Sequence, residues 1–464
     1  MNPVFGEKRG FILGIKKHPL RCDIEKLAIT KLYTHKGGRM KKVANFSKKV
    51  KGQMRETVLD KASWVIGIDI GKEKLSCALM GINKTLICRF EVEGSLAGYN
   101  DLLNRVKREI KGNGKAVFAL EPTGHYWMVL GQFFEDHNQS YVLIHPLVVA
   151  RSREVNRLNK GKTDPLDARL IGELACDGSI TRTQIPADYW ATIRVYAREY
   201  MDREKDIVRE KNRIGSYLET TLLEFVDIFP NPLCMTGRAC IRALAHFREA
   251  SKRDWGHFEK HVRSQFSGKR LVTSRIRRLH EMLQRGDAPG LRAGRQAMCH
   301  RVINCLDRLE IYERQQETAK QALVDSYEKS EYKQYLDSIW GTNATANALV
   351  LGFMGDAAVY DSPASLVKLA GSDPIPDESG KFKGKTSISH RGRSLLRKAG
   401  DRVSFMLEKR NSVFRAFVNH LMSRQKNRLT KRQARIACIN KYFRIVWVLC
   451  NHRVPFNPAL AQTI

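Results

Sequence analysis

The sequence lacks any long apolar segment. None of its apolar runs approaches the roughly 20 residues that a membrane-spanning helix requires. Residues 1–20 contain neither a continuous apolar core nor a small-residue cleavage site, so we expect no secretory signal. Hydrophobic residues still make up 42% of the 464 residues. That content and length predict buried cores in about two or three domains.

Paired cysteine motifs are also missing. The ten cysteines are scattered without a C-x-x-C pair. The nearest cluster, Cys299-His300 with Cys305, has no second ligand pair, which argues against a zinc site. We therefore expect reduced thiols in a cytoplasmic protein.

Acidic residues are scarce relative to basic ones. The chain has 48 Asp and Glu against 81 Lys and Arg, a formal net charge of +33. Such an excess repels itself unless a polyanion neutralises it, which indicates a nucleic-acid partner. A membrane-surface or ribosome-associated protein is the alternative that charge alone leaves open. Residues 1–62 are especially basic and predict an arm that becomes ordered on nucleic acid.

Two predicted buried strands each end on an acid. Residues 64–70 form a near-continuous apolar run with Asp69 near its end, and residues 116–120 are followed directly by Glu121. A charged acid in an apolar strand costs several kcal/mol unless it is paired, so both acids argue for a bound cation. Further strands are predicted over residues 75–80, 85–92 and 141–144, with helices over residues 96–110 and 126–137.

A second pair of acids opens a predicted helix. Thr163 can cap this helix, and Pro165 suits its first turn. Asp164 and Asp167 are spaced i, i+3, so their carboxylates share one helix face. Taken alone, the pair could equally be a solvated acidic helix start. Taken with the two strand-end acids, it predicts four carboxylates that hold one or two Mg²⁺ ions for phosphoryl transfer.

The middle of the chain predicts a long helical hairpin. Apolar residues recur every three or four positions over residues 187–225 and again over residues 302–327, with charges on the opposite faces. The segment between them, residues 234–296, is helical and rich in arginine. The two long helices would form a coiled-coil arm that projects and dimerises, or would simply pack against the body.

A polar loop precedes the last helices. Residues 370–381 are rich in turn formers and contain Ser379, which cationic side chains follow closely. Cations beside a hydroxyl suit a nucleophile that attacks a phosphodiester, although a serine in a basic loop is ordinarily a plain loop residue. Helices are predicted over residues 394–406 and, as a basic amphipathic tail, over residues 425–444.

Five stretches together resemble a known family. They are GIDIGKEK (67–74), ALEPTGHYW (119–127), NKGKTDPLDARLIGEL (159–174), ESGKFKGKTSISHRGRSLLRKA (378–399) and VPF (454–456). In this order and spacing they resemble the DEDD-type insertion-sequence transposases that work as bridge-RNA-guided recombinases. The likeness spans residues 64–458 and leaves out the basic arm.

The resemblance implies an α/β plus all-α protein. It has a RuvC-like, RNase H-fold domain over residues 63–180, a coiled-coil linker over 185–330 and a helical transposase domain over 331–464. It makes Asp69, Glu121, Asp164 and Asp167 the ligands of two Mg²⁺ ions and Ser379 the nucleophile that joins DNA covalently.

The resemblance also implies partners and a location. The partners are donor and target DNA, a structured non-coding guide RNA, and further copies of the chain in a dimer to tetramer whose subunits share each site. We expect a prokaryotic, nucleoid-associated enzyme. The residues expected to neutralise phosphates are Lys160, Lys162, Arg169, Lys381, Arg391 and Arg397.

Two motifs depart from the family pattern. The family's S-K-x-G reads Ser389-His390-Arg391-Gly392 here, so a histidine stands at the lysine position and we expect the neighbouring Arg391 to substitute for the lysine's charge. The family's P-G-x-G, which resembles a phosphate-binding helical hairpin, reads Trp340-Gly341-Thr342-Asn343.

Three other functions fit parts of the pattern. The four acids suit a hydrolytic Holliday-junction nuclease, in which water attacks and no serine is needed. GIDIG also opens actin-like ATPases and sugar kinases, but the chain has no second glycine-rich phosphate loop. A non-catalytic DNA- or RNA-binding protein would need none of the acids.

Overall fold

The computed structural model describes most of the chain from Leu59 onward. It covers residues 59, 62–110, 114–122, 124–156, 164–181, 185, 187–244, 254–266, 268, 270–285, 289–375, 378–379, 382–383 and 386–461, without the side chains of 156, 164–165, 378–379 and 382–383. Nearly all of the predicted basic arm lies outside the described residues. The chain divides into two compact units, Met1–Ile185 and Pro186–Ile464.

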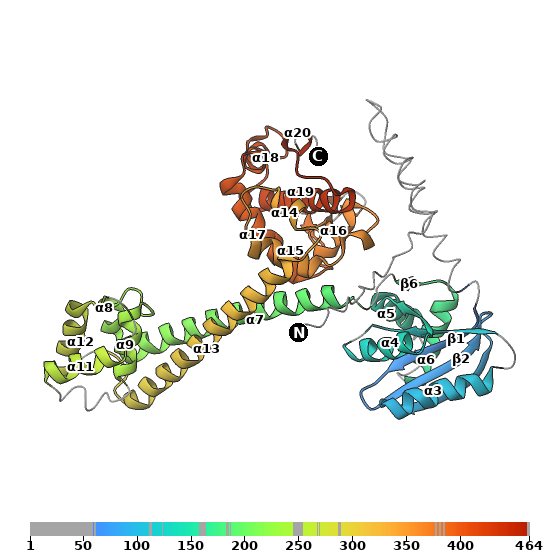
Figure 1. Ribbon diagram of the computed structural model, residues 1–464, viewed down its shortest axis with the longest axis horizontal. Helices are drawn as coiled ribbons and strands as arrows, with labels where there is room; N and C mark the ends of the chain where they lie inside the picture. The colour runs from blue at the N-terminus through green and yellow to red at the C-terminus, as the bar shows by residue number, and fades with distance from the viewer. Residues whose placement is uncertain are drawn as a thin grey trace, which may run out of the picture. The chain divides into compact units, whose positions relative to one another are not determined.

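The first unit is built on a six-stranded mixed sheet (Figure 1). The strands are β1 (Ala62–Ile70), β2 (Lys74–Gly81), β3 (Leu86–Glu93), β4 (Lys115–Leu120), β5 (Ser140–Ile144) and β6 (Ile180–Thr181), in the spatial order β3-β2-β1-β4-β5-β6. The predicted antiparallel meander β1-β2-β3 is confirmed. Strand β4 runs parallel to both β1 and β5, which makes the sheet mixed.

Helices cover both faces of this sheet. They are α3 (Leu96–Glu109), α4 (Tyr126–Asp136), α5 (Pro146–Asn156) and α6 (Asp164–Cys176). Along β4, Phe118 and Leu120 pack with α3 and α4, whereas Val117 and Ala119 pack with α5 and α6. Successive side chains point to opposite faces, so a strand covered on both faces needs a continuous apolar run.

Two glycines let α6 approach β1 unusually closely. A Cβ atom on Gly67 would lie 2.1 Å from the carbonyl oxygen of Ala168 and 2.5 Å from the backbone nitrogen of Gly172. A Cβ on Gly172 would in turn lie 2.5 Å from the Met80 side chain. The backbones of α6 and β1 are therefore in direct contact, which fixes the position of the first turns of α6 over the sheet.

The second unit contains two long helices that lie side by side (Figure 1). They are α7 (Asp188–Thr221) and α13 (Arg295–Glu328). The Tyr189 hydroxyl donates to the Ser326 carbonyl at 3.0 Å, and the Arg301 guanidinium lies over the Tyr217 ring at 4.8 Å. The first pair joins the start of α7 to the end of α13, and the second joins the end of α7 to the start of α13. The two helices are therefore antiparallel, as predicted.

The ends of the long helices differ from the prediction. Helix α7 stops at Thr221 because Leu222 leaves the helical conformation, and a separate helix, α8 (Leu223–Ile228), follows. Helix α13 begins at Arg295, seven residues before the predicted start, directly after the left-handed Gly294 (φ 70°).

A buried carboxylate crosses between the long helices. The Glu210 side chain is 3% exposed and accepts hydrogen bonds from Arg213 at 2.7 Å and from Arg308 at 3.0 Å. Burial alone would raise the pKa of Glu210, but its hydrogen bonds and the nearby arginine charges outweigh burial and leave the pKa below its usual value. This pair selects one register of α7 against α13, because sliding either helix would leave the acid buried without its cation.

The second unit has two hydrophobic cores. One joins the distal parts of α7 and α13 to the short helices between them: α8, α9 (Met235–Ala243), α11 (Trp255–Ser264) and α12 (Thr273–Arg285). The other joins the opposite ends of α7 and α13 to the C-terminal helices. These are α14 (Lys333–Asp337), α15 (Ala344–Met354), η3 (Ala357–Val359), α16 (Pro363–Ala370), α17 (Ser394–Arg410), α18 (Ser412–Ser423) and α19 (Lys431–His452), followed by α20 (Pro458–Ala461).

The predicted C-terminal helix is shifted. It begins at Lys431 and not at Gln425, because Thr430 and Gln433 form a reciprocal capping box at that point. It is also more than a basic surface helix, since Cys438, Tyr442 and Phe443 lie in the core. Helix α18, which precedes it, was not predicted.

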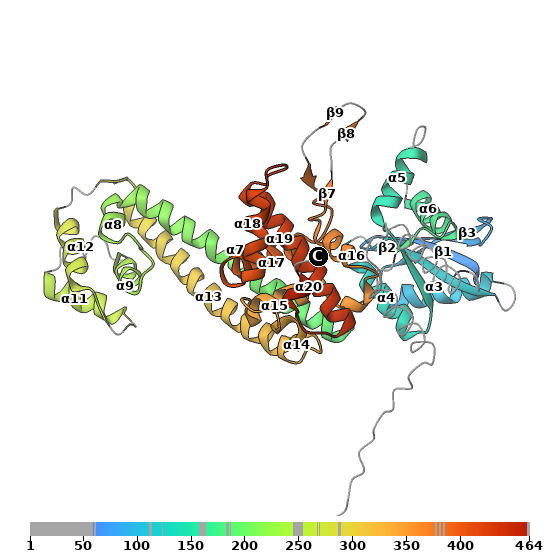
Figure 2. The same cartoon turned by 90° about the horizontal axis from the view of Figure 1, so that it is seen from above.

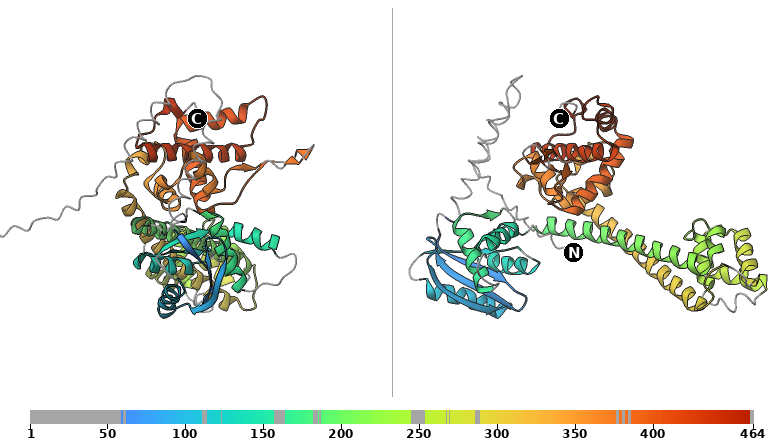
Figure 3. Two further views of the ribbon diagram at one scale, coloured as in Figure 1. Left: turned by 90° about the vertical axis from the view of Figure 1, so that its right-hand side faces the viewer. Right: turned by 180° about the vertical axis from the view of Figure 1, so that it is seen from behind.

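The predicted polar loop contains two short antiparallel ladders. Strand β7 (Pro374–Ile375) pairs with β10 (Ser387–Ile388), and β8 (Glu378–Ser379) pairs with β9 (Phe382–Lys383). Figures 2 and 3 show these ladders, here called the Ser379 hairpin, extending outward from the helices of their own unit. The turn-forming residues correctly predict a loop here. The two short ladders were not predicted, because their residues show no alternation of apolar and polar side chains.

None of the helices in the described ranges is both long enough and apolar enough to cross a membrane.

The close contact between α6 and β1 gives a stability prediction. Gly67→Ala should lower the free energy of unfolding of the first unit by about 2–3 kcal/mol, because the new methyl group has only backbone atoms to displace. Scanning calorimetry would measure the change. Gly215→Ala in α7 is the control, because a Cβ there meets nothing within 4 Å. It should stabilise its helix by up to about 1 kcal/mol, and wild-type stability of Gly67→Ala would contradict the proposed contact.

Candidate active site

Asp69 and Glu121 lie at the same edge of the sheet. In the parallel pair β1–β4, Ile68 is in register with Leu120, and each acid is the next residue along its strand. Asp69 is partly buried, and the Glu121 side chain is largely buried. Parallel neighbours end at the same edge, so this register brings the two predicted acids together.

Helix α6 brings a third acid toward this edge. Asp167 directly precedes Ala168, whose carbonyl oxygen is the atom closest to a Cβ on Gly67. Asp167 is 4% exposed. Asp164 is the first residue of α6, as predicted, but its side chain lies outside the described part of the chain.

One arginine joins two of the acids. The Arg153 Nε donates to Oδ1 of Asp167 at 2.9 Å, and its Nη2 donates to Oε2 of Glu121 at 3.2 Å. The exposed fractions of the three side chains are 22% for Arg153, 6% for Asp167 and 11% for Glu121. A guanidinium fork shared between two largely buried carboxylates neutralises part of their charge and holds them near each other.

Arg153 was missed because its helix was missed. The apolar pattern predicts a strand that ends before Pro146 and no helix after it, whereas α5 begins at that proline. Pro146 at a helix start, followed by the apolar Val149 four residues before Arg153, was the available signal. Val149 is fully buried against the sheet, so Arg153 lies on the inward-facing side of α5.

The acids match the chemistry of a hard divalent cation. All four offer only carboxylate oxygens, the donors that Mg²⁺ prefers. Within the described ranges, no three His, Cys, Asp or Glu side chains are arranged as a ready metal site. The donor set therefore fits the metal, while a guanidinium bridges two of its members.

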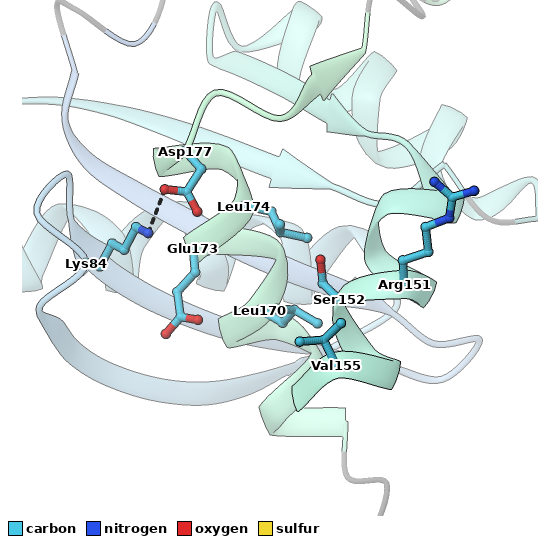
Figure 4. A pocket seen from close by; sticks show the side chains of 8 residues that line it. All are labelled: Lys84, Arg151, Ser152, Val155, Leu170, Glu173, Leu174 and Asp177. Carbon is cyan, nitrogen blue, oxygen red and sulfur yellow. Dashed lines mark ion pairs between the residues drawn. The ribbon is translucent and has the colours of Figure 1, made fainter. Parts of the chain in front are cut away.

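A small pocket is lined mainly by α5 and α6 and does not contain the predicted acids. Its volume is about 300 Å³. Figure 4 shows its lining residues: Lys84, Arg151, Ser152, Val155, Leu170, Glu173, Leu174 and Asp177. Lys84 and Asp177 close one side through an ion pair of 2.6 Å. Asp69, Glu121 and Asp167 do not line it, so it is distinct from the edge where the acids meet.

Three predicted phosphate-binding residues are described and three are not. Lys160, Lys162 and Lys381 lie outside the described residues. Arg169 donates to Glu173 at 2.6 Å on its own helix, and Arg397 donates to the Ala370 carbonyl at 2.7 Å. Arg391 has an exposed side chain, which leaves its guanidinium accessible.

The Ser379 hairpin is anchored at its base. Ser379 stands opposite Phe382 in the outer ladder, and its side chain is outside the description. At the base, the Ser389 hydroxyl donates to the Asp373 carboxylate, and the Asn440 amide of α19 donates to the Ser372 carbonyl at 2.9 Å. These hydrogen bonds hold the base of the hairpin against the helices of its unit.

Two arginines meet at the end of α15, in the same unit. Arg393 donates to the Phe353 carbonyl at 2.7 Å, and Arg194 lies close enough that burial and the charge of Arg393 lower its pKa. No sequence pattern predicts this pair, because Arg194 and Arg393 are far apart in the chain.

Two family models match the chain. A DEDD-type model described as "Transposase" matches residues 66–222, which run from β1 to the end of α7. A model described as "Transposase IS116/IS110/IS902 family" matches residues 333–419, which contain the Ser379 hairpin. The first match includes all four predicted acids, and the second includes the predicted nucleophile.

A curated relative agrees with these matches. A Streptomyces coelicolor protein named as a mini-circle transposase for IS117 is 22% identical over 353 residues, which cover 70% of this chain and 80% of the relative. The sequence motifs, the family models and this relative give one answer: the chain belongs to the IS116/IS110/IS902 family of DEDD-type transposases and is a DNA-recombining enzyme.

Proposed function

We propose that this transposase cuts and rejoins DNA through a Mg²⁺-dependent carboxylate site and a covalent phosphoserine intermediate. The observation that supports the proposal is the contact of both Glu121 and Asp167 with Arg153, at the sheet edge where Asp69 lies near the end of β1. A sheet that positions acids for phosphoryl transfer in this way supports a RuvC-like, RNase H-type domain over residues 63–180.

Asp69, Glu121, Asp164 and Asp167 would hold the metal. When bound, Mg²⁺ would polarise the scissile phosphate and stabilise the charge on the attacking and leaving oxygens. The protein residues do the positioning. Strands β1 and β4 fix Asp69 and Glu121 by register, and the backbone contact between α6 and β1 fixes Asp167.

Ser379 would supply the nucleophile. Its hydroxyl oxygen would form a bond to phosphorus, the phosphodiester bond to the leaving deoxyribose oxygen would break, and that oxygen would take a proton. The serine–phosphate bond conserves the energy needed for rejoining. Of the predicted phosphate-neutralising residues in the described part of this domain, Arg391 is better placed than Arg397, since Arg397 is engaged with the Ala370 carbonyl.

The helical arm would assemble the working oligomer, a dimer to tetramer. We place the arm at residues 185–330 and the transposase domain at residues 331–464. Val195, Val208 and Ile311 are apolar side chains on α7 and α13 that are 63%, 51% and 42% exposed. A second copy packed along the arm as a coiled coil would bury such residues.

RNA guidance is the remaining part of the proposal. Donor and target DNA are the substrates, and a structured non-coding RNA would select them by base pairing. The net charge of +33 supports binding of several nucleic-acid strands at once. The basic arm over residues 1–62 would contribute phosphate contacts without sequence preference.

The metal site gives the first activity prediction. Asp167→Asn should reduce Mg²⁺-dependent DNA strand cleavage by about 100-fold or more, because it removes an ionised ligand from the site. DNA binding should stay within about twofold, since phosphate contacts come from basic residues. Cleavage of labelled DNA on a denaturing gel and a binding assay would measure both.

The matched control is Asp177→Asn. Asp177 directly follows α6, pairs with Lys84 and lies outside the set of predicted ligands. This variant should cleave like the wild type. Full cleavage by Asp167→Asn would remove Asp167 from the metal site.

The proposed nucleophile, Ser379, gives the second activity prediction. Incubation of the protein with Mg²⁺, element RNA and labelled DNA should produce a covalent protein–DNA adduct on a denaturing gel, and Ser379→Ala should abolish it. Ser387→Ala, in β10 of the same hairpin, is the control and should retain the adduct.

The same gel distinguishes the proposed serine mechanism from the main alternative, a hydrolytic nuclease. Cleaved DNA without an adduct in the wild type would indicate a hydrolytic nuclease in which water replaces the serine. An adduct that survives in Ser379→Ala would move the nucleophile to another residue.

A further inference from the structure

An arginine side chain, which is always positively charged, lies among the proposed metal ligands. The Arg153 guanidinium contacts Glu121 with one nitrogen and Asp167 with another, at 3.2 and 2.9 Å. Its side chain comes from α5, a different element from those that carry the acids. The contact is therefore tertiary, and it exists only when α5, β4 and α6 are assembled.

The acids need a cation even without a metal. Asp167 and Glu121 are largely buried, and two such carboxylates repel each other and lose hydration when they are brought together. Arg153 offsets both costs. A divalent ion on the same carboxylates would do so too, but it would then lie next to the guanidinium. Because like charges repel strongly where water is partly excluded, the two cations disfavour each other.

We propose that Arg153 is an internal counter-cation that stabilises the metal-free site and competes with the divalent ion for Glu121 and Asp167. Metal binding then requires the guanidinium to release at least one carboxylate. The long arginine side chain can move without unfolding α5, and 22% of its surface already faces solvent. This inference rests on the metal site proposed above and adds a positioning residue that sets its metal affinity.

The direct test is metal binding alone, without DNA. Mn²⁺ serves as the probe, since it takes the oxygen ligands that Mg²⁺ takes. Isothermal titration of the full-length chain with MnCl₂ should give a dissociation constant for Arg153→Gln that is roughly tenfold lower than for the wild type. A dissociation constant that is unchanged or higher in Arg153→Gln would overturn the proposal.

Arg151→Gln is the matched control. It removes the same charge from the same helix two residues away, and Figure 4 shows the Arg151 side chain on the side of the pocket away from Glu173 and Asp177. Its Mn²⁺ affinity should stay within about twofold of the wild type. An equal gain in both variants would overturn the proposal, because net charge alone would explain it.

Thermal unfolding provides a second readout. In EDTA, Arg153→Gln should unfold roughly 5 °C below the wild type, because two largely buried acids lose the arginine that bridges them. Saturating Mn²⁺ should remove most of this difference. A deficit of equal size with and without Mn²⁺ would mark Arg153 as an ordinary structural residue and overturn its competition with the metal.

Two more variants keep the outcomes distinct. Arg153→Lys keeps the charge without the two-pronged fork, so its Mn²⁺ affinity should fall between those of the wild type and Arg153→Gln, and it carries the test if the glutamine variant does not fold. Asp167→Asn should lose Mn²⁺ binding. If Mn²⁺ binds the wild type and Asp167→Asn equally, or binds no variant, the proposed metal site itself fails. If Asp167→Asn loses Mn²⁺ binding but the Arg153 variants bind Mn²⁺ with wild-type affinity, the metal site is supported and the proposed role of Arg153 is wrong.

Discussion

The backbone contact between β1 and α6 is the constraint on which the proposed active site depends. Gly67 leaves no room for a side chain, since a Cβ would lie 2.1 Å from the Ala168 carbonyl oxygen. This contact positions the first turns of α6 at the edge of the sheet where β1 and β4 end. Asp167 thereby joins Asp69 and Glu121, although nearly a hundred residues separate the first and last of these acids. A larger residue at position 67 would push α6 away from β1 and so displace Asp167, although the new side chain would not contact Asp167 itself.

The strand-end acids Asp69 and Glu121 could be predicted from the sequence, but the arginine that joins Glu121 to Asp167 could not. Asp69 and Glu121 interrupt or follow apolar runs, so simple burial arguments flagged them, and parallel pairing made their meeting a matter of register. Arg153 lies in the second half of a short helix, after the apolar residues 147–150, and its partners are distant in sequence. The same limit applies to Arg194 and Arg393, which only tertiary packing brings together. Ser379 is proposed as the nucleophile on the family resemblance, because residue type alone does not single it out.

Helix boundaries followed local chemistry that the apolar pattern does not record. The capping box of Thr430 and Gln433 starts α19 six residues after the predicted start, and Gly294 starts α13 earlier than the pattern implied. The register of the two long helices depends on Glu210, a buried acid that periodicity treats as a surface residue. In this basic chain, buried carboxylates are the informative residues, because each requires a specific cation.

The central claim is that the edge of the sheet holds a divalent ion between Asp69, Glu121 and Asp167. Crystals grown with Mn²⁺ would test it most directly through anomalous scattering. The account predicts an anomalous peak within bonding distance of these three carboxylates, with Arg153 withdrawn from at least one of them. A peak elsewhere, for example at Glu173 and Asp177, together with an intact Arg153 bridge, would contradict it.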